Sequence, residues 1–532
     1  MKQNRAVYGC AGVVRLLSGY YLVVLTSCCF VERILGRAVF KATNFGIIRC
    51  SAPGSFHAMS KQHKRDEARY LHLLRASLVA NTKHLYFVHG HDMSRNCQSQ
   101  YLLCRPRCSI RATLLHKDPF RNNAECEVVS RSKSGGETHP YGLNDGFKDD
   151  DSVTVISRHR QDDQWSLADK SFCWNRYAGE MLDNIASPED YMGPSVRVLL
   201  LPLICGSFDS FQDAKGNSLS ILARTSISRF GIRHHCRGSN GEGEVANFVE
   251  SEQILHVKYD VKHVTLSSFV MVRGSVPLRW SQPLRDLSWN PKIIFESEGN
   301  FSVTQRHFAN LISNYGRIKV IDLLSSQGEE GMLKHAFRRS VSALPNQPNS
   351  SVQYFHFDLH RETSDHNTVA PESLNSWTKA EVSDLGQFML ASDLEVSGCE
   401  TKLQNGIFRV NCKDCLDRTN LVQSIIARSV LQEQTRTMTG IDIDFRNRCK
   451  GAHKVLWADH GDRISSQYAG TLALRRDLTR AGKRTFRGLL QDARTSLKRY
   501  CRAKLFDGNA QGSLDLWTSQ YLPRRTEDAP LC

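Results

Sequence analysis

The twelve residues RVNCKDCLDRTN, at positions 409–420, concentrate side chains that are suited to chemistry. Cys412 and Cys415 form a C-x-x-C pair, and Arg418 follows Cys412 after five intervening residues. Three kinds of site use such a cluster: half of a zinc site, a redox-active cysteine pair, or a phosphate-binding loop that carries a reactive thiol.

The first two alternatives each leave part of the pattern without a use. A zinc site needs a second pair of ligands, and the obvious candidate is Cys104 with Cys108 in CRPRC, far upstream. A redox pair does not require an arginine at this spacing or the flanking Asp414 and Asp417. We therefore favour the phosphate-binding loop, while the other two interpretations stay open.

The neighbouring residues predict the elements that hold this loop. GIFRVN, before the cysteines, is typical of a strand, and the residues after Arg418 predict a helix. A helix that begins near Thr419 directs its unpaired backbone N–H groups and the positive end of its dipole at the loop. This field favours the thiolate form of Cys412, and the planar guanidinium group of Arg418 can bind two phosphoryl oxygens together. The apolar face of the helix consists of Leu421, Val422, Ile425, Ile426 and Val430.

The composition limits the class of protein and its partners. A chain of 532 residues predicts two or more domains, and 40% hydrophobic with 23% charged residues is typical of a globular protein. The formal charge of +16 favours a polyanionic partner. Nucleic acid is disfavoured, because the sequence has no zinc-finger spacing, RNP-like strand or basic-zipper pattern. The 17 cysteines, an odd number at irregular spacings, indicate reduced thiols in the cytosol.

Three longer stretches predict the organisation of the chain. The most apolar one, residues 11–31, predicts a β-hairpin that turns at Ser18 and Gly19 rather than a membrane span. Residues 97–164 become rich in Gly, Ser and Asp and predict a long exposed insertion. Further on, strand-like runs such as 218–225 alternate with helical patterns, which predicts an α/β second half.

The loop and its flanks resemble the signature of the Sac-domain phosphoinositide phosphatases, whose pattern is close to R-[TS]-N-C-x-D-C-L-D-R-T-N. Further blocks follow the order of that family, from GVVRLLSGYYLVVLTS through LYFVHGHDMS and RGSNGEGEVANFVESEQIL to LWADHGDRISSQYAGT and LTRAGKRT. Only the region near 97–164 and the last residues lack counterparts. The sequence departs from the family pattern at Val410, Leu472 and Arg475.

The resemblance implies a mixed α/β (α+β) fold. An N-terminal β-rich Sac subdomain, residues 1–195 with the insertion at about 97–164, would pack on a larger α/β catalytic domain, residues 196–522. The catalytic domain would carry the Cys-x5-Arg phosphate-binding loop, and residues 523–532 would form a short tail. The blocks look most like the endomembrane branch of the family, but the C-terminal membrane spans that its members often add are not expected here.

The resemblance also implies an enzyme. It would hydrolyse phosphatidylinositol monophosphates, chiefly phosphatidylinositol 4-phosphate and also the 3-phosphate, through a cysteinyl-phosphate intermediate and without a metal or other cofactor. Two alternatives are a phosphatase for phosphatidylinositol 3,5-bisphosphate and a weakly active scaffold that binds phosphoinositides. The enzyme would contact an anionic membrane surface peripherally, at the cytosolic face of the endoplasmic reticulum or Golgi, by its basic surface or through a recruiting protein partner.

The resemblance assigns roles to single residues. Cys412 would be the nucleophile and Arg418 would hold the phosphate. Asp414 or Asp417 would protonate the leaving ring hydroxyl, with Asp358 as a third candidate, although either loop aspartate could instead make the loop rigid. The expected phosphate- and substrate-binding residues are Lys413, Cys415, Leu416, Thr419, Asn420, Lys483 and Arg484.

Other conspicuous residues are interpreted as structural. Cys415 is expected to be buried and to contribute by packing. Arg233 and Arg237 in RFGIRHHCRG are expected to be structural residues of the sheet, and His234 and His235 between them are expected to be ordinary side chains.

Overall fold

The computed structural model describes residues 7–523, apart from 51–55, 58, 105–163, 187–195, 259–262, 285–290, 297–298, 346–351, 360–371, 394–398, 439–440, 483–484 and 522. The strands of the described part are β1 (Gly9–Leu16), β2 (Gly19–Ile34), β3 (Arg37–Arg49), β4 (Leu85–Phe87), β5 (Ile204–Gln212), β6 (Ser218–Thr225), β7 (Val249–Lys258), β8 (His263–Arg273), β9 (Trp280–Ser281), β10 (Ile294–Phe295), β11 (Arg317–Asp322), β12 (Val352–His356), β13 (Phe388–Asp393), β14 (Cys399–Lys402) and β15 (Gly406–Asn411).

The described helices are α2 (Lys61–Asn81), α3 (Cys97–Cys104), α5 (Gln164–Leu167), α6 (Arg176–Ala186), α7 (Asn300–Tyr315), α8 (Gly328–Ser342), α10 (Glu372–Leu385), α11 (Asp417–Thr437), α12 (Ile443–Ala469), α13 (Arg476–Ala481), α14 (Phe486–Leu505) and α15 (Asp507–Trp517). Two short 3₁₀ helices, η1 (Thr82–His84) and η4 (Val196–Leu199), complete the regular structure of the described residues.

A 13-stranded sheet connects the two halves of the chain, in the spatial order β1-β2-β3-β4-β5-β6-β7-β8-β15-β11-β12. Neighbours from β1 to β8 are antiparallel, and β13 pairs with the first part of β8. β15, β11 and β12 are parallel to one another, and β15 is parallel to the end of β8. The carboxyl ends of these four strands therefore lie at one edge of the sheet.

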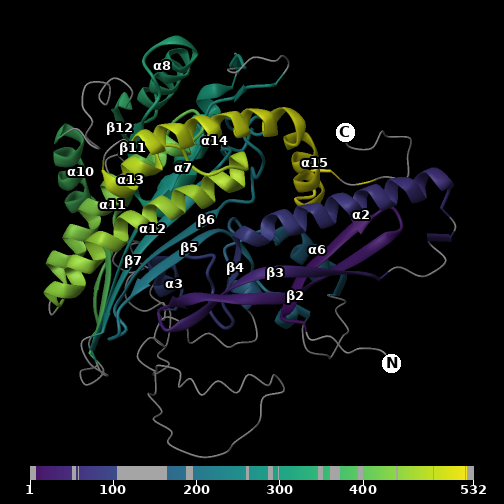
Figure 1. Cartoon of the computed structure of the whole chain (residues 1–532), viewed down its shortest axis with the longest axis horizontal. Helices are drawn as coiled ribbons and strands as arrows, with labels where there is room; N and C mark the ends of the chain where they lie inside the picture. Colours follow the sequence, from purple (N-terminus) through teal and green to yellow (C-terminus); the bar gives the residue numbers. More distant parts are fainter. Residues whose placement is uncertain are drawn as a thin grey trace, which may run out of the picture.

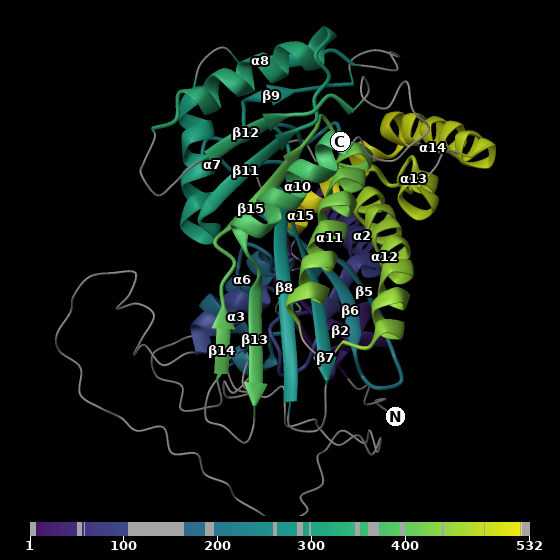
Figure 2. The ribbon, with the colours of Figure 1, turned by 90° about the vertical axis from the view of Figure 1, so that its left-hand side faces the viewer.

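Helices cover both faces of the sheet (Figures 1 and 2). Successive side chains of a strand point to opposite faces. Phe269 and Met271 of β8 accordingly pack in the core under α11 and α12, whereas Val270 and Val272 pack in a second core with residues of α7 and α8. Figure 2 shows α11 and α12 in front of β5 to β8. The α/β character predicted for the second half of the chain is confirmed.

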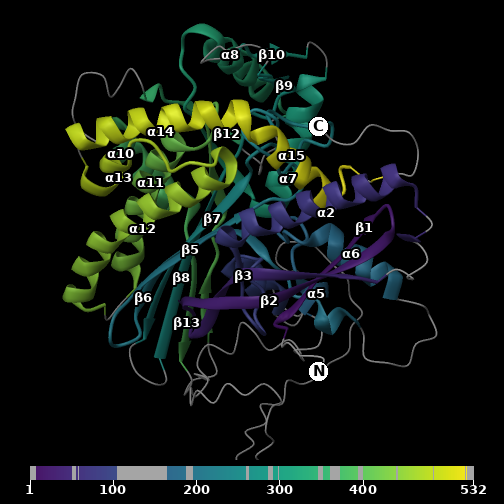
Figure 3. The same cartoon turned by 45° about the vertical axis from the view of Figure 1, so that its right-hand side comes forward.

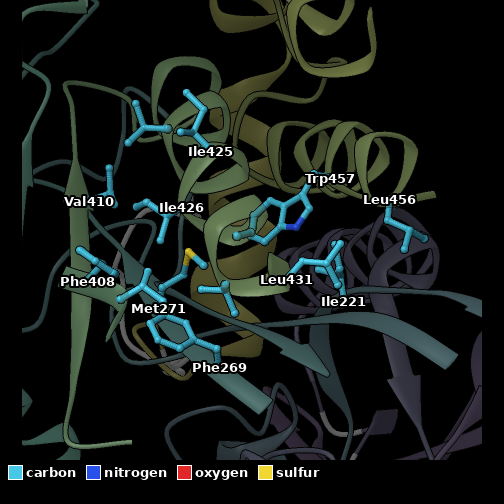
Figure 4. Packing of buried hydrophobic residues seen from close by; sticks show 14 of the residues in the cluster. Ile221, Phe269, Met271, Phe408, Val410, Ile425, Ile426, Leu431, Leu456 and Trp457 are labelled. Atoms are coloured by element: carbon cyan, nitrogen blue, oxygen red, sulfur yellow. The ribbon is translucent and has the colours of Figure 1, made fainter. Parts of the chain in front are cut away.

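The core beneath α11 fixes the helix that follows the cysteine loop. Figure 4 shows Phe408 and Val410 of β15 facing Ile425 and Ile426 of α11, with Trp457 of α12 on the far side. The apolar face that the sequence predicted for this helix is confirmed, because all five of its residues are buried. Those residues are Leu421, Val422, Ile425, Ile426 and Val430.

The N-terminal part is a β-rich unit under α2 (Figure 3). β1 and β2 form the predicted hairpin, with Leu16 opposite Gly19. The buried Glu67 of α2 holds its turn, accepting hydrogen bonds from the N–H of Leu17 at 2.9 Å and the hydroxyl of Tyr21 at 2.7 Å. α15, near the other end of the chain, packs against α2, as Figure 3 also shows. Contacts distant in sequence thus bind the two ends together.

The expected exposed insertion begins with a buried element. Residues 97–104 form α3, whose Cys97 and Tyr101 are buried, so exposure does not hold for this first part. The helix packs there because Cys97 and Tyr101 join the core beneath β4 and β5, whereas Leu102 and Leu103 on its other side are exposed. The remainder, 105–163, lies outside the described residues. In the described segments, no helix is long and apolar enough to cross a membrane.

Candidate active site

The cysteine loop lies at the carboxyl edge of the parallel strands. Cys412 follows β15 directly, Gly274 follows β8 and Leu323 follows β11. The N–H of Leu323 donates to the carbonyl oxygen of Asn411 at 2.8 Å, which joins two of these ends. Ligand sites of open α/β sheets form at this edge. The predicted strand, tight loop and helix are confirmed, since β15 ends at Asn411 and α11 begins at Asp417.

The thiol of Cys412 is buried but carries a lowered pKa. Only 2% of the residue is exposed, and its sulfur accepts hydrogen bonds from the N–H of Cys415 at 3.0 Å and the hydroxyl of Thr419 at 3.4 Å. Burial raises the pKa of Cys412, but the contact with Cys415, the charge of Arg418 and the Thr419 hydroxyl outweigh it and lower the pKa to about 6. Most of this sulfur is therefore thiolate at neutral pH.

Cys415 shapes the loop through its backbone. Its φ of 52° lies in the left-handed region, which is unfavourable for a residue with a Cβ and turns its N–H toward the sulfur of Cys412. Its own thiol donates to the carbonyl oxygen of Gly274 at 2.9 Å. Burial raises the pKa of Cys415 well above its ordinary value, so this thiol stays protonated. The predicted burial of Cys415 is confirmed.

The guanidinium group of Arg418 is oriented by α8. Its Nη1 and Nη2 donate to the two carboxylate oxygens of Glu330 at 2.9 and 3.0 Å, and Nη1 also donates to the carbonyl oxygen of Leu323 at 3.0 Å. Among the described residues, no hydrogen bond uses the N–H of Nε or the second N–H of Nη2. One edge of the planar fork thus keeps two donors for an oxyanion.

Two arginines from another part of the chain hold Asp414. Arg233 reaches one carboxylate oxygen at 2.7 Å and Arg237 reaches the other at 2.6 Å. Burial raises the pKa of Asp414, but these two arginines and Lys413 hold it well below its ordinary value. The expected location of Arg233 and Arg237 in the sheet is wrong. They lie in the connection between β6 and β7, which passes beside the cysteine loop.

The second loop aspartate is also paired with an arginine. Asp417, the first residue of α11, accepts two hydrogen bonds from Arg499 of α14 at 2.8 and 3.1 Å. It also accepts the N–H of Leu474 at 2.6 Å. Asp417 therefore ties the start of α11 to the helices that follow it, and neither loop carboxylate is without a cationic partner.

The other expected binding residues differ in their surroundings. Thr419 contacts the sulfur of Cys412, as described above, and the Nζ of Lys413 lies 3.7 Å from Glu330. Leu416 is buried, and the side chain of Asn420 donates to a carbonyl oxygen of α12 at 2.9 Å. Leu416 and Asn420 are thus packed in the interior behind the loop.

Three residues that the sequence singled out lie outside the loop. Lys483 and Arg484 lie outside the described residues. Asp358 follows β12 at the same carboxyl edge as the cysteine loop, where it accepts the N–H of Ser326 at 2.9 Å.

Two buried arginines beside the loop were not predicted from the sequence. Arg273 at the end of β8 donates to the side chains of Asn420 at 3.1 Å and His460 at 2.8 Å. Arg409 of β15 donates to the carbonyl oxygen of Ser275 at 2.7 Å. Burial lowers the pKa of each arginine to about 10. The available signal was a charged residue within each of two apolar strand segments. Such residues could have been singled out, because a buried charge without a function is rare.

The described residues contain no group of three or more His, Cys, Asp or Glu side chains that is placed to hold a metal ion. Cys412 and Cys415 are both free cysteines. The described site brings together the Cys412 thiol, the N–H and hydroxyl groups that donate to it, and several arginines beside the loop, which is chemistry suited to a phosphate ester.

Comparison with known proteins agrees with this chemistry. The chain matches the SacI homology domain over residues 8–364. It is 32% identical to phosphoinositide phosphatase SAC7 of Arabidopsis thaliana, with 98% of this chain and 76% of that protein aligned. It is 32% identical to phosphatidylinositol-3-phosphatase SAC1-B of Danio rerio (97% and 77% aligned) and 31% identical to phosphatidylinositol-3-phosphatase SAC1 of Drosophila melanogaster (99% and 77% aligned).

The chain therefore belongs to the SacI homology domain family of phosphoinositide phosphatases, as the resemblance predicted. Its enzyme class is that of a phosphoinositide-directed hydrolase.

Proposed function

We propose that the chain hydrolyses phosphatidylinositol monophosphates through a cysteinyl-phosphate intermediate, with the 4-phosphate as its chief substrate and the 3-phosphate as a second one. The observation that carries the proposal is the geometry at Cys412, whose sulfur accepts hydrogen bonds from the N–H of Cys415 and the hydroxyl of Thr419, while the charge of Arg418 helps to lower its pKa. The zebrafish and fly relatives are named phosphatidylinositol-3-phosphatases, which supports a phosphatidylinositol monophosphate as substrate.

The proposed reaction has two displacement steps. In the first, the thiolate of Cys412 attacks the phosphorus, an S–P bond forms and the bond from phosphorus to the ring oxygen breaks. In the second, water attacks the same phosphorus, the S–P bond breaks, and inorganic phosphate leaves with the thiolate restored. The free edge of Arg418 and the loop N–H groups hold the equatorial oxygens in both steps. We expect no requirement for a metal, because these groups supply the positive charge.

The ring oxygen needs a proton as its bond to phosphorus breaks, and Asp414 and Asp417 are the proposed donors. A protonated Asp414 requires that its arginine partners be drawn away, because Arg233 and Arg237 stabilise the carboxylate. A doubly charged substrate phosphate near the loop competes for those arginines, and its arrival would raise the pKa of Asp414 toward the range of a general acid.

The proposed enzyme acts at an anionic membrane surface on the cytosolic face of the endoplasmic reticulum or Golgi. The formal charge of +16 supports attraction to such a surface, since cytosolic leaflets carry negative charge. A recruiting protein partner remains a second proposed route to the membrane.

Phosphate release from a panel of phosphoinositides tests the proposal. We expect activity on the 4-phosphate, weaker activity on the 3-phosphate and no effect of a chelator. Cys412→Ser should reduce kcat/KM by at least about 1000-fold, whereas Cys29→Ser, the same change at an exposed cysteine of β2, should retain most of it. Release from phosphatidylinositol 3,5-bisphosphate alone would indicate the alternative substrate. Binding without turnover would indicate a scaffold, and chelator-sensitive activity that survives Cys412→Ser would overturn the mechanism.

A further inference from the structure

α14 presents an apolar stripe to solvent. Phe486 is 80% exposed and Leu490 is 50% exposed, and Leu489 and Leu497 are also exposed. Residues 486, 489, 490, 493 and 497 follow the spacing of one helix face. In Figure 2 the helix lies at the outer edge of the molecule beside α13. Large apolar side chains gathered on one exposed face mark an interaction surface.

The opposite edge of α14 attaches it to the body of the protein. Arg499 and Ala503 are its buried residues, and Arg499 forms the ion pair with Asp417 at the start of α11. The carboxylate of Asp492, on the same edge, accepts the N–H of Arg475 at 3.0 Å. The stripe therefore faces away from the fold, and no segment in the described part of the chain covers it.

Basic side chains accompany the stripe. Among the 20 residues of α14 six are Lys or Arg, and Asp492 is the single acidic residue. Arg487, Arg494 and Lys498 are exposed next to the stripe, and in the described part of the chain they form no ion pair with a carboxylate. An apolar face bordered by uncompensated cations is the pattern of a helix that lies in the interface of an anionic membrane.

The position of α14 relates this surface to the site. Through Arg499 and Asp417 the helix is fixed to the first residue of α11. A membrane bound to its outer face would lie about one helix diameter, roughly 10 Å, from that ion pair. A phosphorylated inositol ring extends from the bilayer into this space. The charge and the geometry thus favour a lipid surface over a second protein chain as the occupant.

We propose that the outer face of α14 is a membrane-docking surface, in which Phe486, Leu489, Leu490 and Leu497 insert into an anionic bilayer while the flanking basic residues bind its lipid headgroups. The inference adds a membrane contact to the proposed function. Its consequence for catalysis rests on that proposed function. Docking places the cysteine loop at the height of the headgroups, so that turnover of bilayer substrate depends on the stripe.

Vesicle flotation tests the docking directly. The probe is a vesicle of phosphatidylcholine and phosphatidylserine without any phosphoinositide, so that binding does not depend on substrate recognition. Leu490→Glu should lower the partition coefficient at least 10-fold. Gln491→Glu adds the same charge at the next, exposed residue outside the stripe and should lower it by less than about 3-fold. Leu497→Ser, which changes no charge, should give a loss comparable to that of Leu490→Glu.

Kinetics on two forms of substrate separate this proposal from the proposed function. Leu490→Glu should reduce hydrolysis of bilayer phosphatidylinositol 4-phosphate at least 10-fold and leave hydrolysis of its dioctanoyl form, dissolved as monomers, unchanged. If the wild-type chain does not hydrolyse the soluble substrate, the proposed function fails and flotation still decides the docking surface. If the wild-type chain does hydrolyse the soluble substrate, and Leu490→Glu binds vesicles as well as the wild type, then only the docking proposal is overturned.

Light scattering in solution tests the remaining possible occupant of the stripe, a second copy of the chain. We expect the wild type and Leu490→Glu to have the same molecular mass in solution. A wild-type dimer that Leu490→Glu converts to a monomer would overturn the proposal, because the stripe would then be a contact between copies of the chain.

Discussion

Glu330 holds Arg418 by two parallel hydrogen bonds, so that a carboxylate from the first turn of α8 occupies one edge of the guanidinium group. Burial raises the pKa of Glu330, but Arg418 lowers it and keeps the carboxylate ionised. A bidentate pair of this kind fixes the plane of the guanidinium group. The two donors that remain on the other edge then point in one direction before any substrate arrives, and Glu330 acts as a positioning residue.

Replacing Glu330 tests this relationship. Glu330→Gln removes the charge and one acceptor, so Arg418 gains freedom, and kcat/KM should fall about 10-fold on every phosphoinositide. Inhibition by orthovanadate should weaken in parallel, which a change confined to the fold would not require. Glu329→Gln is the matched control, since Glu329 accepts the N–H of Ile293 and does not touch Arg418. A Glu330→Gln enzyme that is faster than wild type would show that the carboxylate blocks Arg418 instead.

The pKa of Cys412 sets the pH dependence of the reaction. Because the pKa is lowered to about 6, the sulfur is mainly protonated below pH 6 and mainly thiolate above it. We expect kcat/KM on a soluble substrate to rise about tenfold per pH unit below 6 and to level above it. The rate of alkylation of Cys412 by iodoacetamide, measured by mass spectrometry, should follow the same curve.

The charge of Arg418 is one of the groups that lower this pKa. In Arg418→Ala the alkylation curve should therefore shift to higher pH, toward the value of about 8.5 for a free cysteine. Cys501, which is exposed on α14, provides an internal control because its alkylation should not respond to the substitution. An unchanged midpoint at Cys412 would contradict the assigned electrostatics.

The loop and its two flanking elements were predictable because their signals are local. The strand-like composition of GIFRVN and the apolar spacing from Leu421 to Val430 are properties of a few consecutive residues, and both elements formed as predicted. The resemblance supplied the family, which comparison confirmed. The β1–β2 hairpin was likewise readable from its turn residues.

The partners of the loop were not predictable, because they come from distant parts of the chain. Arg233 is 181 residues from Asp414, Glu330 is 88 residues from Arg418, and Arg499 lies 82 residues from Asp417. A single sequence contains no periodicity that reports such ion pairs. From the sequence alone, the two loop aspartates therefore remained alternatives for the single role of proton donor. In the fold they differ, because Asp414 pairs with Arg233 and Asp417 pairs with Arg499.

Glu67 is expected to matter for stability rather than for catalysis. Its buried carboxylate accepts from Leu17, Ser18 and Tyr21, and an amide in its place would direct an NH₂ group at one of these donors. Glu67→Gln should lower the free energy of unfolding by about 2 kcal/mol and the melting temperature by a few degrees. Asp66→Asn, at the neighbouring and more exposed residue, should change the melting temperature by less than a degree or so. An unchanged melting curve for Glu67→Gln would contradict the assigned role.

The choice between Asp414 and Asp417 as proton donor depends on the leaving group. The hydroxyl of an inositol ring is a poor leaving group that needs a proton, whereas the phenolate of an activated aryl phosphate leaves without one. Replacing the general acid should therefore slow hydrolysis of phosphatidylinositol 4-phosphate by about 100-fold or more and leave hydrolysis of the aryl ester nearly unchanged.

Asp414→Asn and Asp417→Asn, each measured on both substrates, apply this test, and we expect each residue to give a different pattern. Asp417 is fixed to Arg499 and Leu474 at the start of α11, so its replacement disturbs the loop and should slow both substrates together. Asp414 is held by arginines that a substrate phosphate can draw away, so its replacement should slow the lipid selectively. Arg233→Lys weakens the hold on Asp414 and raises its pKa, so it should move the alkaline limb of the pH profile on the lipid to higher pH without affecting the aryl ester. Equal losses on both substrates for Asp414→Asn would show that Asp414 positions the loop. Asp358, at the same edge of the sheet, would then be the proton donor to test next.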